Sequence, residues 1–191
     1  GDKGQHQDQR MHMDYGNNTF HHPPSFDNPD VVAFILYYSD TSITGGSTAY
    51  VPRLSSKRDI WYDEPYVKMP GQGGIPFINN KEQAEQMLNE RNINRDSLYE
   101  REVTPNFSQG DVLVYRHDVW HRGTKVKKGY VRYVHNIAYK KRHCVWIYSW
   151  TNFAKKMYYG HIERFLLQLT PIQLYVLGFE MKHFQRYFPK L

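Results

Sequence analysis

Apolar residues occur in short runs along the chain, and turn-forming residues separate these runs. The clearest run covers residues 31–38, VVAFILYY, which is continuous and rich in β-branched and aromatic side chains, as is typical of a strand buried on both faces. A shorter run at residues 48–52 follows a Thr-Gly-Gly-Ser turn signal and predicts a returning strand. Residues 112–115 and 130–139 predict two further strands. Several short strands between turns indicate a sandwich or jelly roll rather than a parallel α/β sheet.

Helical patterns interrupt and follow these strands. Asn80 is a suitable N-cap for an amphipathic helix that runs through Glu90. Apolar residues recur at helical spacing over residues 152–169, and Thr170-Pro171 supplies an N-cap and a first-turn proline for a final helix. We therefore expect helices beside the strands and at the C-terminus.

The stretch from Arg53 to Ile78 is rich in proline, glycine and aromatic residues and shows no clear period. It predicts a long loop or insertion of the kind that often covers a site. The domain organisation that we expect is a β core over residues 1–150, followed by a helical segment over residues 151–191 that packs on it.

Composition sets broad limits. The 191 residues fit one domain with a real core, and the net charge of +6 would suit an anionic partner. The basic residues are scattered, however, except near residues 125–128 and 140–142, which makes a nucleic-acid partner less favoured. The single cysteine, Cys144, excludes an internal disulfide and predicts an intracellular protein without indicating its compartment. No apolar run is long enough to cross a bilayer, and no signal peptide is visible.

Two histidines and one aspartate, far apart in sequence, are the candidates for chemistry. His12 and Asp14 form a His-x-Asp pair, and alternate residues of a strand point to one face. His121, arriving from a distant strand, would complete a set of two imidazoles and one carboxylate that leaves metal positions open for other ligands. His6 and Asp8 form a competing His-x-Asp pair, and a lone His121 is by itself more often structural.

Arg132 stands in the otherwise apolar run of residues 130–139, where alternation would place it on one face with Val134, Asn136 and Ala138. A guanidinium on an inward face is costly unless it is paired, so it needs a carboxylate or phosphate. The partner is either a bound anion, held bidentately, or an acidic residue of the protein itself.

Four segments occur in the order found in a known family: HMDYGNNT at residues 12–19, GGSTAYVPR at 45–53, GDVLVY at 110–115, and WHRGTKVKKGYVRYVHNIAY at 120–139. The chain resembles the phytanoyl-CoA dioxygenase family of iron(II)- and 2-oxoglutarate-dependent oxygenases. The resemblance implies a mainly β fold, a double-stranded β-helix (jelly roll, cupin-like) with flanking and C-terminal α-helices.

The resemblance also implies roles for five residues. Fe(II) would be bound by His12, Asp14 and His121, the co-substrate 2-oxoglutarate by Arg132, and Gly123 would lie near that arginine. Such enzymes use O2 to hydroxylate a C–H bond, here of an unidentified small molecule, while 2-oxoglutarate is decarboxylated to succinate. Asp14 favours hydroxylation over halogenation, because the related halogenases lack this carboxylate.

One departure from the family opens an alternative. Only eleven residues precede His12, whereas family members have helices and outer strands there. We therefore expect that the chain is a fragment lacking the N-terminal part of the domain, or that a protein partner covers that side of the sheet. The alternative function is a non-catalytic oxygenase-fold module within a larger assembly. A nucleic-acid demethylase is disfavoured, because the segment after Arg132 lacks the second arginine associated with that group.

Overall fold

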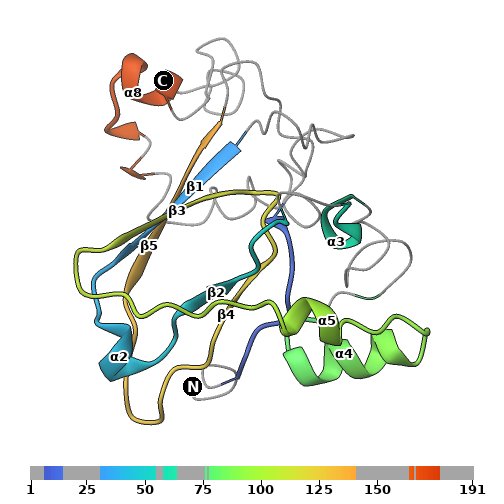
Figure 1. Cartoon of the computed structure of the whole chain (residues 1–191). Coiled ribbons are helices and arrows are strands. Elements are labelled where there is room, and N and C mark those ends of the chain that lie inside the picture. The colour runs from blue at the N-terminus through green and yellow to red at the C-terminus, as the bar shows by residue number, and fades with distance from the viewer. Residues whose placement is uncertain are drawn as a thin grey trace. The chain divides into compact units, whose positions relative to one another are not determined.

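The computed structural model describes residues 7–14, 31–54, 58–63, 76, 78–140, 164–165 and 167–176. The chain divides into two units, residues 1–147 and 148–191, and each is described by itself. The strands of the first unit are β1 (Val31–Tyr37), β2 (Thr48–Tyr50), β3 (Val112–Arg116), β4 (His121–Gly123) and β5 (Val134–Lys140), shown in Figure 1. Its helices are α2 (Thr41–Thr44), α3 (Ile60–Asp63), α4 (Lys81–Asn89) and α5 (Asp96–Tyr99).

The sheet β3-β1-β5 is antiparallel, with β1 in the centre. Ile35 of β1 lies opposite Leu113 of β3 and Asn136 of β5. Every second residue of β1 is buried and the residues between are half-buried, so the expectation that this strand is buried on both faces is wrong. Val112 and Val114 of the neighbouring strand β3 lie on the same face of the sheet as the half-buried residues of β1, and both are about half exposed. This face of the sheet is therefore only partly covered.

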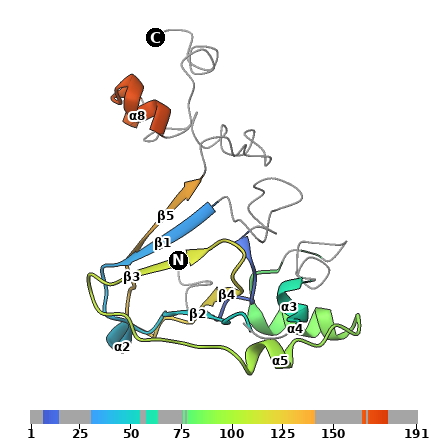
Figure 2. The same cartoon turned by 45° about the horizontal axis from the view of Figure 1, so that its top comes forward.

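A second antiparallel sheet pairs β2 with β4, and Figure 2 shows these two strands running beside each other, apart from β1, β3 and β5. Isolated bridges extend it on both sides. Tyr50 of β2 bridges to Val103, and His121 of β4 bridges to His12. The N-terminal segment therefore continues this sheet beyond β4. Antiparallel strands and few helices agree with the mainly β fold expected from the sequence, as far as the described residues go.

The helix predicted after Asn80 is confirmed. The Asn80 side chain accepts a hydrogen bond from the backbone N–H of Gln83, and α4 buries Ala84 and Leu88. The stretch expected to be a loop contains α3, a short helix that begins beside Asp59. Its first turn is held locally, because the Asp59 backbone and side chain accept hydrogen bonds from residues of α3.

The strand predicted at residues 130–139 begins only at Val134. Its partner β1 ends at Tyr37, which lies opposite Val134, so residues 130–133 have no complete strand to pair with. In the second unit, α8 (Pro171–Val176) begins after Thr170, whose hydroxyl oxygen accepts a hydrogen bond from the N–H of Gln173. This confirms the predicted N-cap.

The helix predicted over residues 152–169 falls largely outside the described residues. Among the helices that the structure describes, none is long and apolar enough to cross a membrane.

Candidate metal centre

The segment that carries His12 and Asp14 is held by the two methionines that alternate with them. Met11 and Met13 are fully buried in a core cluster with Trp61 and other apolar side chains. Alternation along an extended segment then directs His12 and Asp14 to the opposite side. The expected strand is shorter than predicted, because His12 is paired only in an isolated bridge and Asp14 lies beyond it.

His121 is placed by β4 in the same way. The preceding residue, Trp120, is fully buried, and its indole N–H donates to the backbone carbonyl of Trp61 at 2.7 Å. His121 and His12 form a backbone-paired bridge, with N···O distances of 3.0 and 2.9 Å. Residues opposite each other in such a bridge project to the same face, so both imidazoles reach one side of the sheet.

The three predicted ligands meet there. His12 Nε2 lies 3.8 Å from Asp14 Oδ1, and His121 Nε2 lies 3.6 Å from Asp14 Oδ2. One nitrogen or oxygen atom from each residue can be chosen so that all lie within 4.8 Å of one another. Two atoms that share a metal ion at about 2.1 Å can be at most about 4.2 Å apart, so small side-chain rotations suffice for common coordination.

The tautomers of both histidines suit metal binding. His12 Nδ1 lies 3.0 Å from the Arg10 carbonyl oxygen, and His121 Nδ1 lies 2.9 Å from the Val119 carbonyl oxygen. A carbonyl oxygen only accepts, so each Nδ1 carries the proton and each Nε2 keeps a free lone pair. Histidines that bind metals are commonly fixed in this way by a carbonyl on the other ring nitrogen.

Two further residues contact the carboxylate, and the sequence reasoning missed both. The Tyr115 hydroxyl donates to Asp14 Oδ2 at 3.2 Å, and His117 Nε2 lies 3.9 Å from the same oxygen. Tyr115 belonged to a predicted strand but had no sequence signal that linked it to Asp14. His117 follows that strand and stands in no recognisable motif. Tyr115 and His117 are two residues apart, so an extended chain points both side chains to one face, the face toward His121. This spacing is the only sequence signal that could have suggested them.

Burial and neighbouring charges set the protonation of the site. Burial, and next the adjacent His121, lower the pKa of His12 to about 3, so this imidazole is neutral near pH 7. Burial alone would raise the pKa of Asp14, but the surrounding histidines and the Tyr115 hydrogen bond outweigh it and hold that pKa below its ordinary value. Burial raises the pKa of Tyr115, which therefore remains a hydrogen-bond donor. The site thus presents a carboxylate and a neutral imidazole, the forms in which both bind metals.

Helices α4 and α5 secure the ligand segment from its other side. The Arg95 guanidinium, with a fully buried side chain, donates to the Met11 carbonyl at 3.0 Å and pairs with Glu85 of α4. Tyr99 of α5 accepts from the Met11 N–H at 3.2 Å and donates to Glu85 at 2.7 Å. The side chains of Arg95 and Tyr99 thus form hydrogen bonds with both backbone groups of Met11, the residue before His12.

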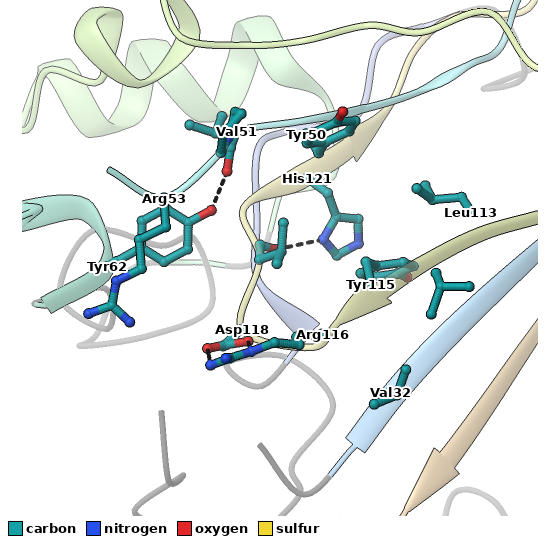
Figure 3. Close-up of a pocket in the computed structure, with 13 residues that line it drawn as sticks. Val32, Tyr50, Val51, Arg53, Tyr62, Leu113, Tyr115, Arg116, Asp118 and His121 are labelled. Carbon is teal, nitrogen blue, oxygen red and sulfur yellow. Dashed lines mark hydrogen bonds and ion pairs between the residues drawn. The ribbon is translucent and has the colours of Figure 1, made fainter. Parts of the chain in front are cut away.

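A cavity of about 520 Å3 adjoins the site and has His121 and Tyr115 in its wall. Figure 3 shows the His121 ring between Tyr50 and Tyr115, with Leu113 nearby. The Tyr115 and His121 ring centroids are 4.8 Å apart. The charged side chains of the wall are paired, Arg116 with Asp118 within the wall and Arg53 with Asp63 outside it. The cavity therefore offers mainly apolar and aromatic contacts beside the candidate metal position.

Arg132 and Gly123 line a second cavity, of about 290 Å3, and not the one that contains His121. Arg132 precedes β5, so the expectation that it stands within a strand is wrong. Its guanidinium donates to the Gly46 carbonyl, and in the described part of the chain no acidic residue pairs with it. The predicted alternative of an internal salt bridge is thus not seen among these residues.

Asp8, the acid of the competing His-x-Asp pair, does not contact the candidate metal ligands but other residues. Asp8 accepts from the Lys125 N–H at 2.7 Å and lies 3.2 Å from the Arg122 guanidinium. His6 falls outside the described residues.

Two imidazoles and one carboxylate form a donor set that suits an Fe(II) ion of the facial-triad type and that zinc also accepts. Comparison with protein-family models gives no match to this chain, and comparison with curated proteins gives none either. The geometry of the site is therefore the basis for assigning a function to this chain.

Proposed function

We propose that this chain is an Fe(II)- and 2-oxoglutarate-dependent dioxygenase that hydroxylates a C–H bond of a small molecule, on a double-stranded β-helix similar to that of the phytanoyl-CoA dioxygenase family. The observation that carries the proposal is the meeting of His12, Asp14 and His121, with both Nδ1 atoms held by backbone carbonyls. This donor set leaves several metal positions open, which a structural metal site does not do.

Iron, 2-oxoglutarate and O2 supply, when bound, the chemistry that hydroxylates the substrate and releases succinate and carbon dioxide. The chain's own residues hold and orient these groups. His12, Asp14 and His121 would hold the metal, and Tyr115 would keep the Asp14 carboxylate turned toward it. The apolar cavity beside His121 would bind the substrate and limit access of water.

Arg132 supports the co-substrate part of the proposal. It is partly buried, and burial lowers its pKa, yet it has only a backbone carbonyl as hydrogen-bond partner in the described residues. A guanidinium in such surroundings favours an anionic ligand. The distal carboxylate of 2-oxoglutarate is the group that we assign to it.

The proposal is tested by binding first and by turnover second. Titration of the chain with Fe(II) under nitrogen should show one site per chain, and addition of 2-oxoglutarate should give saturable binding that requires the metal. Under air, the loaded protein should release succinate even without its substrate, because many such oxygenases turn over slowly in this way. Asp14→Ala should abolish metal binding, since the remaining imidazoles carry no charge to hold a divalent cation.

Asp8→Ala is the matched control, because it removes the acid of the other His-x-Asp pair while leaving the cluster intact. It should bind Fe(II) as the wild type does. Selective binding of zinc without any affinity for 2-oxoglutarate would overturn the proposal, because a site of two histidines and one carboxylate also serves zinc hydrolases. Failure to bind any metal would favour the non-catalytic module instead.

A further inference from the structure

The second cavity is lined by donors and lies where the N-terminal segment passes beside the end of β4. Its polar side chains are those of Gln7, Gln9, Asn79, Thr124, Tyr130 and Arg132. No aspartate or glutamate is found among the described residues of its wall. A partly buried arginine together with amide groups, and no acid, is complementary to a small anion.

Gln9 is held in a definite orientation. Its Oε1 accepts from the Gly123 N–H at 2.9 Å, and its own backbone N–H donates to the Gly123 carbonyl at 2.9 Å. Of the two polar atoms of the Gln9 carboxamide only the oxygen can accept from a backbone N–H, so the Nε2 amino group must point away from the Gly123 N–H. That amino group has no acceptor among the residues described.

Glycine at position 123 is what makes room for this arrangement. A Cβ atom at Gly123 would lie 2.8 Å from Gln9 Oε1 and 3.2 Å from its Cδ, which is too close for either atom to stay in place. The carboxamide of Gln9 therefore occupies the space that a side chain at position 123 would fill. It places a hydrogen-bond donor on the face of β4 that also carries His121.

Polar groups connect this face to Arg132. His121 and Gly123 are two residues apart on β4, which is about 6.6 Å along a strand. Thr48 of β2 lies opposite Gly123, and its hydroxyl accepts from Tyr37 at 2.6 Å. Burial lowers the pKa of Arg132, and the neighbouring Tyr37 opposes this shift. Gln9 and Arg132 line the same cavity, so a dicarboxylate that extended from the metal along this face would meet both side chains.

We infer that Gln9 is a co-substrate-binding residue, whose Nε2 amino group donates, together with the Arg132 guanidinium, to the distal carboxylate of 2-oxoglutarate. The inference rests on the proposed function, and it extends the binding site to a residue three positions before His12. It also assigns the second cavity to the carboxylate end of the co-substrate.

The test uses Gln9→Glu in the full chain. This substitution keeps an oxygen for the Gly123 N–H and replaces the amino group with an anionic oxygen. The affinity for 2-oxoglutarate is measured by calorimetry with Mn(II), a metal that fills the site without turnover. We expect the dissociation constant to rise on the order of tenfold or more, because like charges face each other across the site. Gln9→Met, similar in length but without hydrogen-bonding groups, should weaken binding in the same direction.

A second ligand distinguishes the loss of a direct contact between Gln9 and the distal carboxylate from a general change in the structure of the site. 2-Oxopentanoate has the same metal-binding end as 2-oxoglutarate but no distal carboxylate. Its affinity should be equal in the wild type and both variants. Gln83→Glu, the same chemical change at an exposed position of α4, should leave both affinities unchanged.

Unchanged 2-oxoglutarate affinity in Gln9→Glu would overturn the inference, and so would an equal loss for both ligands. If Arg132→Ala weakens 2-oxoglutarate binding while neither Gln9 variant does, the proposed function stands and only the role of Gln9 falls. If the wild type binds Mn(II) but no 2-oxoglutarate at all, the proposed function fails, and this inference with it.

Discussion

The hydroxyl group of Tyr115 donates a hydrogen bond of 3.2 Å to Oδ2 of Asp14, and so joins β3 to the segment that carries two of the three candidate metal ligands. The bond fixes one carboxylate oxygen and leaves Oδ1 on the side of His12. Outer hydrogen bonds of this kind orient metal ligands and strengthen metal binding. If the proposed function holds, this contact allows the metal affinity to be altered without removing a ligand.

Tyr115→Phe should weaken Fe(II) or Mn(II) binding by roughly tenfold, because the Asp14 carboxylate loses the donor that orients it. Competition against a chelator of known affinity measures this effect. Tyr50→Phe is the matched control, since Tyr50 lies opposite His121 in the same cavity and its hydroxyl has no hydrogen-bond partner among the described residues. Equal metal affinity in Tyr115→Phe and the wild type would show that the bond does not orient the ligand.

Without metal, the protein should lose stability as the pH falls from about 7 to 5. The pKa of His12 is about 3 in the folded chain, whereas an unfolded histidine titrates near 6.5. Between these values the unfolded state binds a proton that the folded state does not, so lowering the pH favours unfolding. Burial also lowers the pKa of His117, which adds an effect of the same sign.

The contribution of His12 over this interval is on the order of 1 to 2 kcal/mol. Urea denaturation in a chelating buffer at pH 7 and pH 5 measures it. His12→Gln should reduce the loss by about that amount, because glutamine does not titrate. An identical pH dependence in this variant and the wild type would contradict the prediction.

Arg95→Met should lower the free energy of unfolding by roughly 3 to 5 kcal/mol, because it leaves Glu85 and the Met11 carbonyl without their buried partner. Urea denaturation is the measurement. Arg53→Met is the control, since the Arg53–Asp63 pair is 47% and 29% exposed and should contribute less than about 1 kcal/mol. A similar small loss of unfolding free energy in both variants would show that Arg95 does not secure the segment that carries His12 and Asp14.

Gly123→Ala should lower the free energy of unfolding by about 1 kcal/mol or less, because its Cβ would lie 2.8 Å from Gln9 Oε1 and the flexible carboxamide would shift and give up its hydrogen bond to the N–H of residue 123. The same substitution in a Gln9→Ala background should cost less, since the crowding atom has been removed. Chemical denaturation of the four proteins of this cycle gives the coupling between the two positions. Additive effects would mean that Gln9 does not occupy the space beside Gly123.

Local chemistry explains which elements were predictable from sequence. The run at residues 31–38 is β-branched and apolar, and it forms β1. Asn80 and Thr170 cap α4 and α8 through their own side chains, so those helix starts depend on a few adjacent residues. The start of β5 and the exposure of β3 depend instead on where a partner strand ends and on what covers the outer face. Neither is encoded locally.

The sequence by itself determined the types of ligand and the alternation that sends Met11 and Met13 to one side and His12 and Asp14 to the other. Only the tertiary structure decided that His121 meets them, since the bridge between His12 and His121 joins segments distant in sequence. The contacts of Tyr115 with Asp14 and of Gln9 with Gly123 could not be read from the sequence either, because a residue's face within one strand says nothing about which other strand lies across from it. Proximity in the site is set by strand pairing, and pairing depends on how the whole chain packs.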